Sequence, residues 1–140
     1  MCMSIKLNEQ IKTTEKDIVV YKLLYVPNKG TIKALFNTYE YHLNKLNEEL
    51  RFLNETIKNL NNKKGCIDIG FHSFVKKKDA FKFRKGFNFG EYSSLKVYKC
   101  IIPKGSKYIE GEYIDTTVHK VFKNIVSDKI IIIKKVNKFF

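Results

Sequence analysis

The segment from residue 76 to residue 89 holds the side chains best suited to chemistry. It interleaves six lysines and arginines with four phenylalanines. Aromatic rings stack on nucleobases and cations pair with phosphates, so this mixture is typical of a site for a nucleotide or a nucleic acid. The simpler alternative is an amphipathic helix whose phenylalanines lie in the core and whose lysines are only solvated.

From this segment and two positions outside it we predict a ligand-binding site. In it, Phe87 would stack on a base and Asn88 would hydrogen-bond the edge of that base. Lys104 belongs to a cationic turn whose backbone amides and lysines suit an anion, although a tight hairpin turn needs no such role. His72 follows a glycine where the chain leaves a strand, and a structural histidine is the alternative. The predicted ligand-binding residues are His72, Lys82, Arg84, Phe87, Asn88 and Lys104.

Groups that could catalyse a reaction are scarce. The chain has no Gly-x-Ser-x-Gly motif, no glycine-rich phosphate loop before a helix and no His-x-x-x-His pair. Its three histidines are isolated, and its carboxylates are not paired as glycoside hydrolysis requires. We therefore predict a binding protein rather than an enzyme, with no catalytic residue, no metal site and no cofactor.

The charge of the chain indicates an anionic partner. Its 140 residues include 27 lysines and arginines against 14 aspartates and glutamates, a net charge of +13. Such a balance favours nucleic acid, a nucleotide or a membrane surface. Coding bias toward A and T explains many lysines but favours glutamate as well, so it does not explain the imbalance. Only Arg51 and Arg84 are arginines, which makes sequence-specific reading of DNA less expected.

The cysteines and the hydrophobic runs bear on location. Cys2, Cys66 and Cys100 share no short spacing, which favours a reducing compartment with free or buried thiols. The longest purely apolar run is the four isoleucines at 130–133, far too short to span a membrane. We predict a cytoplasmic protein with no membrane partner, in the host cytoplasm if the gene belongs to a phage.

One long helix is expected to position these groups. Between residues 32 and 60 apolar residues recur at alternating intervals of four and three, which is a heptad repeat. A helix over 31–62 would be about 48 Å long, longer than a compact domain of this size is wide. We therefore predict a homo-oligomer through the stripe; a helix that crosses its own sheet, or two shorter helices, are the alternatives. The predicted oligomerisation residues are Tyr39, Leu43, Leu46, Leu50, Leu53, Ile57 and Leu60.

The rest of the chain reads as strands around a short basic helix. Residues 1–16 are polar and expected to be loosely ordered, whereas 17–26, 66–74, 95–102, 108–114, 118–122 and 130–136 are rich in β-branched and aromatic residues. Short turns between successive strands favour antiparallel pairing. The predicted fold is one α+β domain over 1–140, with the long helix at 31–62, a mostly antiparallel sheet within 66–136 and a basic helix at 76–85.

Two stretches resemble small uncharacterised proteins of bacteria and their phages. The first is Gly-Phe-His-Ser-Phe at 70–74 with Asp79-Ala80, and the second is Lys-Cys-Ile-Ile-Pro-Lys-Gly-Ser-Lys-Tyr at 99–108 with Gly111 and Ser-Asp-Lys-Ile at 127–130. The overall arrangement predicted for the chain, a short basic α+β domain with a long assembly helix, resembles the Thoeris anti-defence type of phage protein. Proteins of that type sequester a cyclic nucleotide signal between protomers without cleaving it, so the resemblance implies an oligomeric nucleotide sponge.

Two hypotheses about function follow. The first is a non-enzymatic sponge for a small anionic nucleotide such as a cyclic ADP-ribose-like molecule or a cyclic oligonucleotide. The second is a basic protein that binds nucleic acid or inhibits a nucleic-acid-processing enzyme. A continuous basic face and salt-sensitive binding would favour the second.

Overall fold

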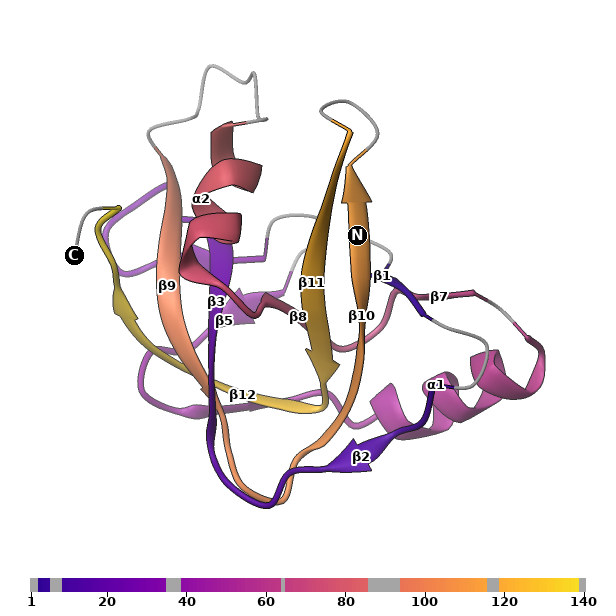
Figure 1. Cartoon of the computed structure of the whole chain (residues 1–140). Coiled ribbons are helices and arrows are strands. Elements are labelled where there is room, and N and C mark those ends of the chain that lie inside the picture. Colours follow the sequence, from indigo (N-terminus) through magenta and orange to yellow (C-terminus); the bar gives the residue numbers. More distant parts are fainter. Residues whose placement is uncertain are drawn as a thin grey trace.

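Over the residues that the structure describes, the chain forms one twelve-stranded sheet with two short helices (Figure 1). The computed structural model describes residues 3–5, 9–34, 39–63, 65–85, 94–115 and 119–138. The helices are α1 (Phe52–Asn61) and α2 (Lys77–Lys85). The strands are β1 (Met3–Ser4), β2 (Lys12–Thr13), β3 (Ile18–Tyr25), β4 (Ile32–Lys33), β5 (Glu40–Tyr41), β6 (Leu46–Glu48), β7 (Cys66–Ile67), β8 (Phe71–Phe74), β9 (Leu95–Ile102), β10 (Lys107–Asp115), β11 (Lys120–Ser127) and β12 (Lys129–Lys135).

The main path of the sheet runs β6-β12-β9-β3-β8-β11-β10-β1-β7, with β2, β4 and β5 attached beside it. Each pairing between the named strands is antiparallel. The longest ladders join β3 to β9 and β10 to β11, eight residue pairs each. Gly105, at φ +87° in the turn between β9 and β10, supplies the left-handed backbone that this tight connection needs.

Alternation along the strands divides the core between the two faces of the sheet. Val20, Cys100 and Ile132 lie opposite one another on β3, β9 and β12, and each is completely buried. The hairpin β4–β5 packs on this face through Ile32 and Tyr41. The other face of β3 and β9 carries the residues that pack against α2, and a third cluster forms around Phe52 of α1.

The predicted α+β fold with one long helix is wrong. Over the described residues of 31–62, the chain forms β4, β5, β6 and only the ten-residue helix α1. Phe36 of the predicted stripe lies outside the described residues. The argument for self-association through a continuous helical seam is therefore lost. Five of the stripe residues are nevertheless exposed large apolar side chains: Leu43, Leu46, Leu50, Leu53 and Ile57.

Asn47 shows why this segment does not continue as a helix. Its side chain is 1% exposed, and its amide bonds the backbone of His42, Lys45 and Ile130. An asparagine that bonds nearby backbone competes with helical hydrogen bonding and favours turns. Asn44, at φ 57°, adds a left-handed residue in the same turn. The tertiary pairing of β6 with β12 thus overrides the heptad spacing.

The N-terminal segment is also more ordered than predicted where the structure describes it. Met3 and Ser4 pair with β7, and Ser4 also pairs with Glu112 of β10. Lys12 and Thr13 of β2 pair with the beginning of β10. Met3 is completely buried against Phe52, so this segment contributes to the core.

Candidate functional site

Helix α2 presents a stripe of lysines to solvent. Lys78, Lys82 and Lys85 are exposed and are spaced by four and three residues, so they lie on one face of the helix. We call these three residues the lysine stripe. At a rise of about 1.5 Å per residue, the stripe extends over about 10 Å. No ion pair joins these lysines to a carboxylate in the part of the chain that the structure describes.

The opposite side of α2 holds the helix on the sheet. Ala80, Phe81 and Phe83 are buried, and Phe83 contacts Phe74 and Phe122 with ring centroids 5.3 and 6.1 Å apart. These contacts fix which face of α2 can reach solvent. The helix therefore confirms the solvated amphipathic arrangement and also leaves the lysine stripe free to meet a ligand.

The end of β12 brings another cation to this helix. Val136 donates its backbone N–H to Val97 and packs against the cluster that α2 covers. Lys138 follows, and both a hydrogen bond with Lys85 and the charge of Lys85 lower the pKa of Lys138. Two ammonium groups held this close repel each other unless an anion lies near them.

The structure does not bring the six predicted ligand-binding residues together. Lys82 belongs to the lysine stripe, but Arg84 is half-buried, with its Nε buried. Lys104 lies beyond the end of β9 that is remote from α2, and its backbone N–H donates to Asp17 at 2.8 Å (Figure 1). Phe87 and Asn88 lie outside the described residues.

His72 is held inside the protein rather than in a binding site. Its Nε2 lies 2.9 Å from the carbonyl oxygen of Ile67, and its Nδ1 lies 3.3 Å from that of Gly70. Burial lowers the pKa of His72 to about 4, although its carbonyl contacts act in the opposite direction. The ring is therefore neutral at pH 7 and ties the bend between β7 and β8, which agrees with the structural alternative.

A second buried ionisable group lies beside His72 and was not identified from the sequence. Lys22 of β3 is 6% exposed; its ammonium donates to the carbonyl oxygen of His72 and lies 5.4 Å from the ring centre of Tyr41. Burial lowers the pKa of Lys22 to about 8, and burial raises the pKa of Cys100 to about 12. Because successive side chains of a strand point to opposite faces, the sequence of β3 could have predicted that Lys22 lies on the buried face.

This environment predicts how stability depends on pH. Because the folded state holds Lys22 with a pKa near 8, the unfolded state binds more protons above that pH. The free energy of unfolding should therefore rise by about 1 kcal/mol between pH 8 and pH 9. Above pH 9 the raised pKa of Cys100 works in the opposite direction, since the unfolded thiol ionises first.

Urea unfolding at pH 8 and pH 9 measures this rise. The variant Lys22→Met should lose it, whereas Lys123→Met, which changes an exposed lysine of β11, should retain it. Equal pH dependence in wild type and Lys22→Met would show that Lys22 is not the responsible group.

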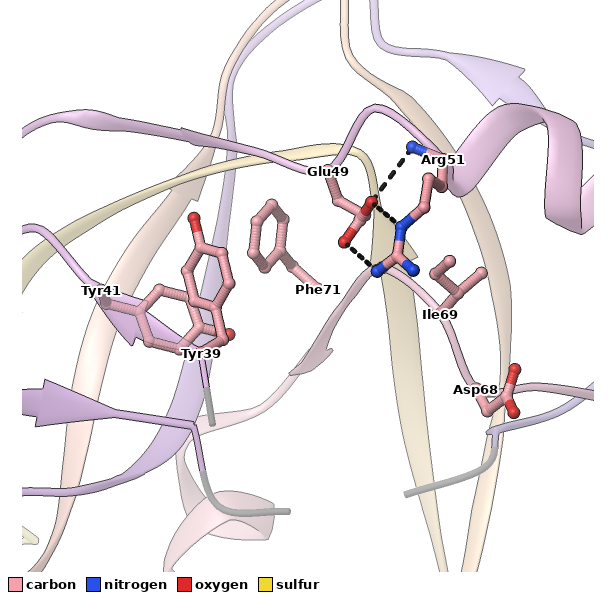
Figure 2. Close-up of a pocket in the computed structure, with 8 residues that line it drawn as sticks. Tyr39, Tyr41, Glu49, Arg51, Asp68, Ile69 and Phe71 are labelled. Carbon is pink, nitrogen blue, oxygen red and sulfur yellow. Dashed lines mark hydrogen bonds and ion pairs between the residues drawn. The ribbon is translucent and has the colours of Figure 1, made fainter. Parts of the chain in front are cut away.

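A polar pocket opens on the face opposite α2 (Figure 2). It has a volume of about 270 Å³, and Tyr39, Tyr41 and Phe71 form one side of it. The ring centroids of these residues lie 4.8 to 5.7 Å apart. Glu49 and Arg51 lie on the other side of Phe71, joined by hydrogen bonds of 3.0 and 3.1 Å.

The charges of this pocket do not suit a phosphate. Arg51 directs both Nε and Nη2 to the carboxylate of Glu49, and this pairing lowers the pKa of Glu49. Asp68, at the far rim, adds a second negative charge. The pocket thus combines aromatic rings with an excess of carboxylate, whereas the phenylalanines within α2 itself are buried and only its lysines reach solvent.

The described residues include no group of three or more histidine, cysteine, aspartate or glutamate side chains that could hold a metal ion. Neither helix in this part of the chain has the length and apolar character that crossing a membrane requires.

Comparison with known proteins identifies no relative. No protein-family model, no curated protein and no solved structure matches the chain. The comparisons therefore give no support to the resemblance to Thoeris anti-defence proteins, which stays a hypothesis from the sequence. Functional conclusions must come from the geometry of the chain itself.

Proposed function

We propose that the protein binds nucleic acid without catalysing a reaction, and that the lysine stripe contacts the phosphate backbone. The observation that carries the proposal is the placement of Lys78, Lys82 and Lys85 on one solvent-facing side of α2, without a carboxylate partner among the described residues. The stripe is about 10 Å long, and one DNA strand presents a phosphate about every 3.4 Å along the axis. Its length therefore corresponds to about three phosphate steps along one strand, so each lysine of the stripe can meet a different phosphate.

The proposed contacts are made by lysines rather than arginines, and this determines whether the protein recognises the phosphate backbone or the bases. A lysine ammonium is a point charge, whereas bidentate reading of guanine normally uses arginine. Arg84 is half-buried, and Arg51 lies in the pocket of Figure 2, paired with Glu49. We therefore expect binding that depends on the phosphate backbone and not on base sequence.

The sponge hypothesis requires rings and cations in one small site. In the described residues the lysine stripe and the ring-lined pocket lie apart: the stripe is on α2, and the pocket has two carboxylates against one arginine. An extended polyanion thus fits the described surface better than a small nucleotide does. An anti-defence role depends on the resemblance alone, and self-association through the exposed leucines likewise stays a proposal.

A cytoplasmic location is part of this proposal, because nucleic acid is accessible there. The cysteines correct the sequence-based expectation in one respect: Cys100 is a buried free thiol, but Cys66 is disulfide-bonded. Disulfide bonds are more typical of oxidising compartments. Thiol labelling of protein extracted under acid quench will show whether Cys66 is oxidised in the cell.

The salt dependence of binding tests the proposal. For three phosphate contacts, log K plotted against log of the KCl concentration should have a slope of about −3. Each of Lys78→Ala, Lys82→Ala and Lys85→Ala should make this slope less steep by about 1. Fluorescence anisotropy of a labelled 20-base-pair duplex at several KCl concentrations measures the slope directly.

Two controls separate the stripe from overall charge and from nucleotide binding. Lys58→Ala and Lys63→Ala remove exposed lysines in and just after α1, and should leave the slope unchanged. AMP at equal phosphate concentration should compete poorly with the duplex. Unchanged binding by the triple stripe variant would refute the proposal, and equal competition by AMP would favour the sponge instead.

A further inference from the structure

In the pocket of Figure 2, the carboxylate of Glu49 is better shielded from solvent than its cationic partner. The side chain of Glu49 is 18% exposed, while that of its partner Arg51 is 72% exposed. Glu49 also accepts the backbone N–H of Arg51 at 3.1 Å, which fixes the carboxylate at the beginning of α1. The carboxylate of Glu49 is therefore held in place by the fold, whereas the exposed guanidinium of Arg51 can be displaced by another cation.

The aromatic side of the pocket is also fixed. Phe71 is 4% exposed and Tyr41 is 6% exposed, and their rings contact each other and the ring of Tyr39. The ammonium of Lys22 lies 5.4 Å from the centre of the Tyr41 ring. Figure 2 shows the Glu49 carboxylate between Phe71 and the guanidinium of Arg51. A planar cation that pairs with Glu49 in place of Arg51 would therefore lie on the side of the carboxylate away from Phe71.

We propose that this pocket binds a guanidinium group from another molecule, and that Arg51 occupies Glu49 until that ligand replaces it. The ligand takes the two carboxylate contacts that Arg51 makes, on the side of Glu49 that faces away from Phe71. A guanidinium fits better than an ammonium because its fork of N–H groups matches a carboxylate with two parallel contacts. The volume of about 270 Å³ admits one such side chain.

The site is independent of the proposed nucleic-acid surface. The aromatic side of the pocket belongs to the core cluster on the face with Val20 and Cys100, whereas α2 packs on the other face of β3 and β9. Its ligand also carries the opposite charge. Failure of one proposal therefore leaves the other unaffected.

Titration of the protein with agmatine, followed by NMR shifts of the aromatic protons, tests the inference. We expect saturable binding that weakens about 10-fold or more in Glu49→Gln, because a charge-assisted bidentate contact is lost. Arg51→Ala should strengthen binding by up to about 5-fold, because an exposed ion pair no longer competes. A capped Gly-Arg-Gly peptide as second probe distinguishes an arginine side chain, which would bind more tightly than agmatine, from a free small molecule.

Matched variants exclude a general charge effect. Glu40→Gln removes an exposed carboxylate of β5, and Lys45→Ala removes an exposed cation before β6; neither residue lines the pocket, and both variants should bind agmatine like wild type. Absence of saturable agmatine and peptide binding would overturn the proposal. Equal weakening by Glu40→Gln and Glu49→Gln would overturn it as well, as would weaker binding by Arg51→Ala.

Discussion

Replacing Phe52 by alanine will lower the free energy of unfolding by about 3–5 kcal/mol. Phe52 is completely buried at the start of α1, where it packs with Met3, Ile67 and Ile109. Its ring also lies against Gly70: a Cβ added there would come within 2.8 Å of the Phe52 ring. The side chain thus joins the N-terminal strand, the sheet and α1, and its removal leaves a cavity that none of these elements can easily fill.

Urea unfolding followed by circular dichroism measures the loss, since the chain has no tryptophan. The neighbouring substitution Leu53→Ala is the control, because Leu53 is 36% exposed on the same helix and its truncation should cost less than about 1 kcal/mol. A stability of Phe52→Ala within 1 kcal/mol of wild type would show that α1 is not anchored as described.

Acidification will destabilise the protein through His72. Because the folded state keeps His72 neutral with a pKa near 4, while the unfolded value is about 6.5, the unfolded state binds the extra proton in this range. The contribution of His72 is therefore complete above pH 6.5 and is lost as pH falls to 4. The expected loss is about 3 kcal/mol, at about 1.4 kcal/mol per pH unit.

The substitution His72→Gln isolates this effect. Glutamine keeps a donor toward the carbonyl of Ile67 but does not titrate, so the difference in unfolding free energy between pH 6.5 and pH 4 should be about 3 kcal/mol smaller than in wild type. His42→Gln changes an exposed histidine and should retain the wild-type loss. The same pH dependence in wild type and His72→Gln would contradict the assignment.

Four long strands and one helix outside residues 31–62 could be predicted because their local signals agree with their tertiary roles. The predicted strand at 95–102 coincides with β9, and those at 17–26, 108–114 and 130–136 match β3, β10 and β12 to within a residue or so. The helix predicted at 76–85 is α2. In each case β-branched or amphipathic periodicity coincides with a buried face.

The segment at 32–60 was mispredicted because the spacing of its apolar residues carries no information about the strands with which it pairs. The interval pattern at 32–60 fits a heptad, yet Ile32 and Tyr41 are buried under the sheet and Leu50 is 80% exposed. What decides the structure is the backbone pairing of β6 with β12 and the hydrogen bonds of Asn47, which join residues far apart in sequence. Such pairing depends on β12 being present and cannot be read from the segment itself.

The candidate site likewise combines features that the local sequence predicts with contacts that it does not predict. Helix periodicity correctly separates the exposed lysines of α2 from its buried phenylalanines. It could not show that Lys104 lies beyond the far end of β9, or that Glu49 and Arg51 meet the rings of Tyr39 and Phe71. Those contacts arise only when β5, β8 and the beginning of α1 converge.

The two ends of the main strand path have a consequence for behaviour at high concentration. Its terminal strands, β6 and β7, are only three and two residues long, and beyond β6 the free side of β12 carries exposed Lys134 and Lys135. A long unpaired edge would template the addition of further chains, whereas short edges and lysines hinder it. Strand addition at these two borders, and with it the growth of fibrils from them, is therefore disfavoured although the protein is rich in β-strands.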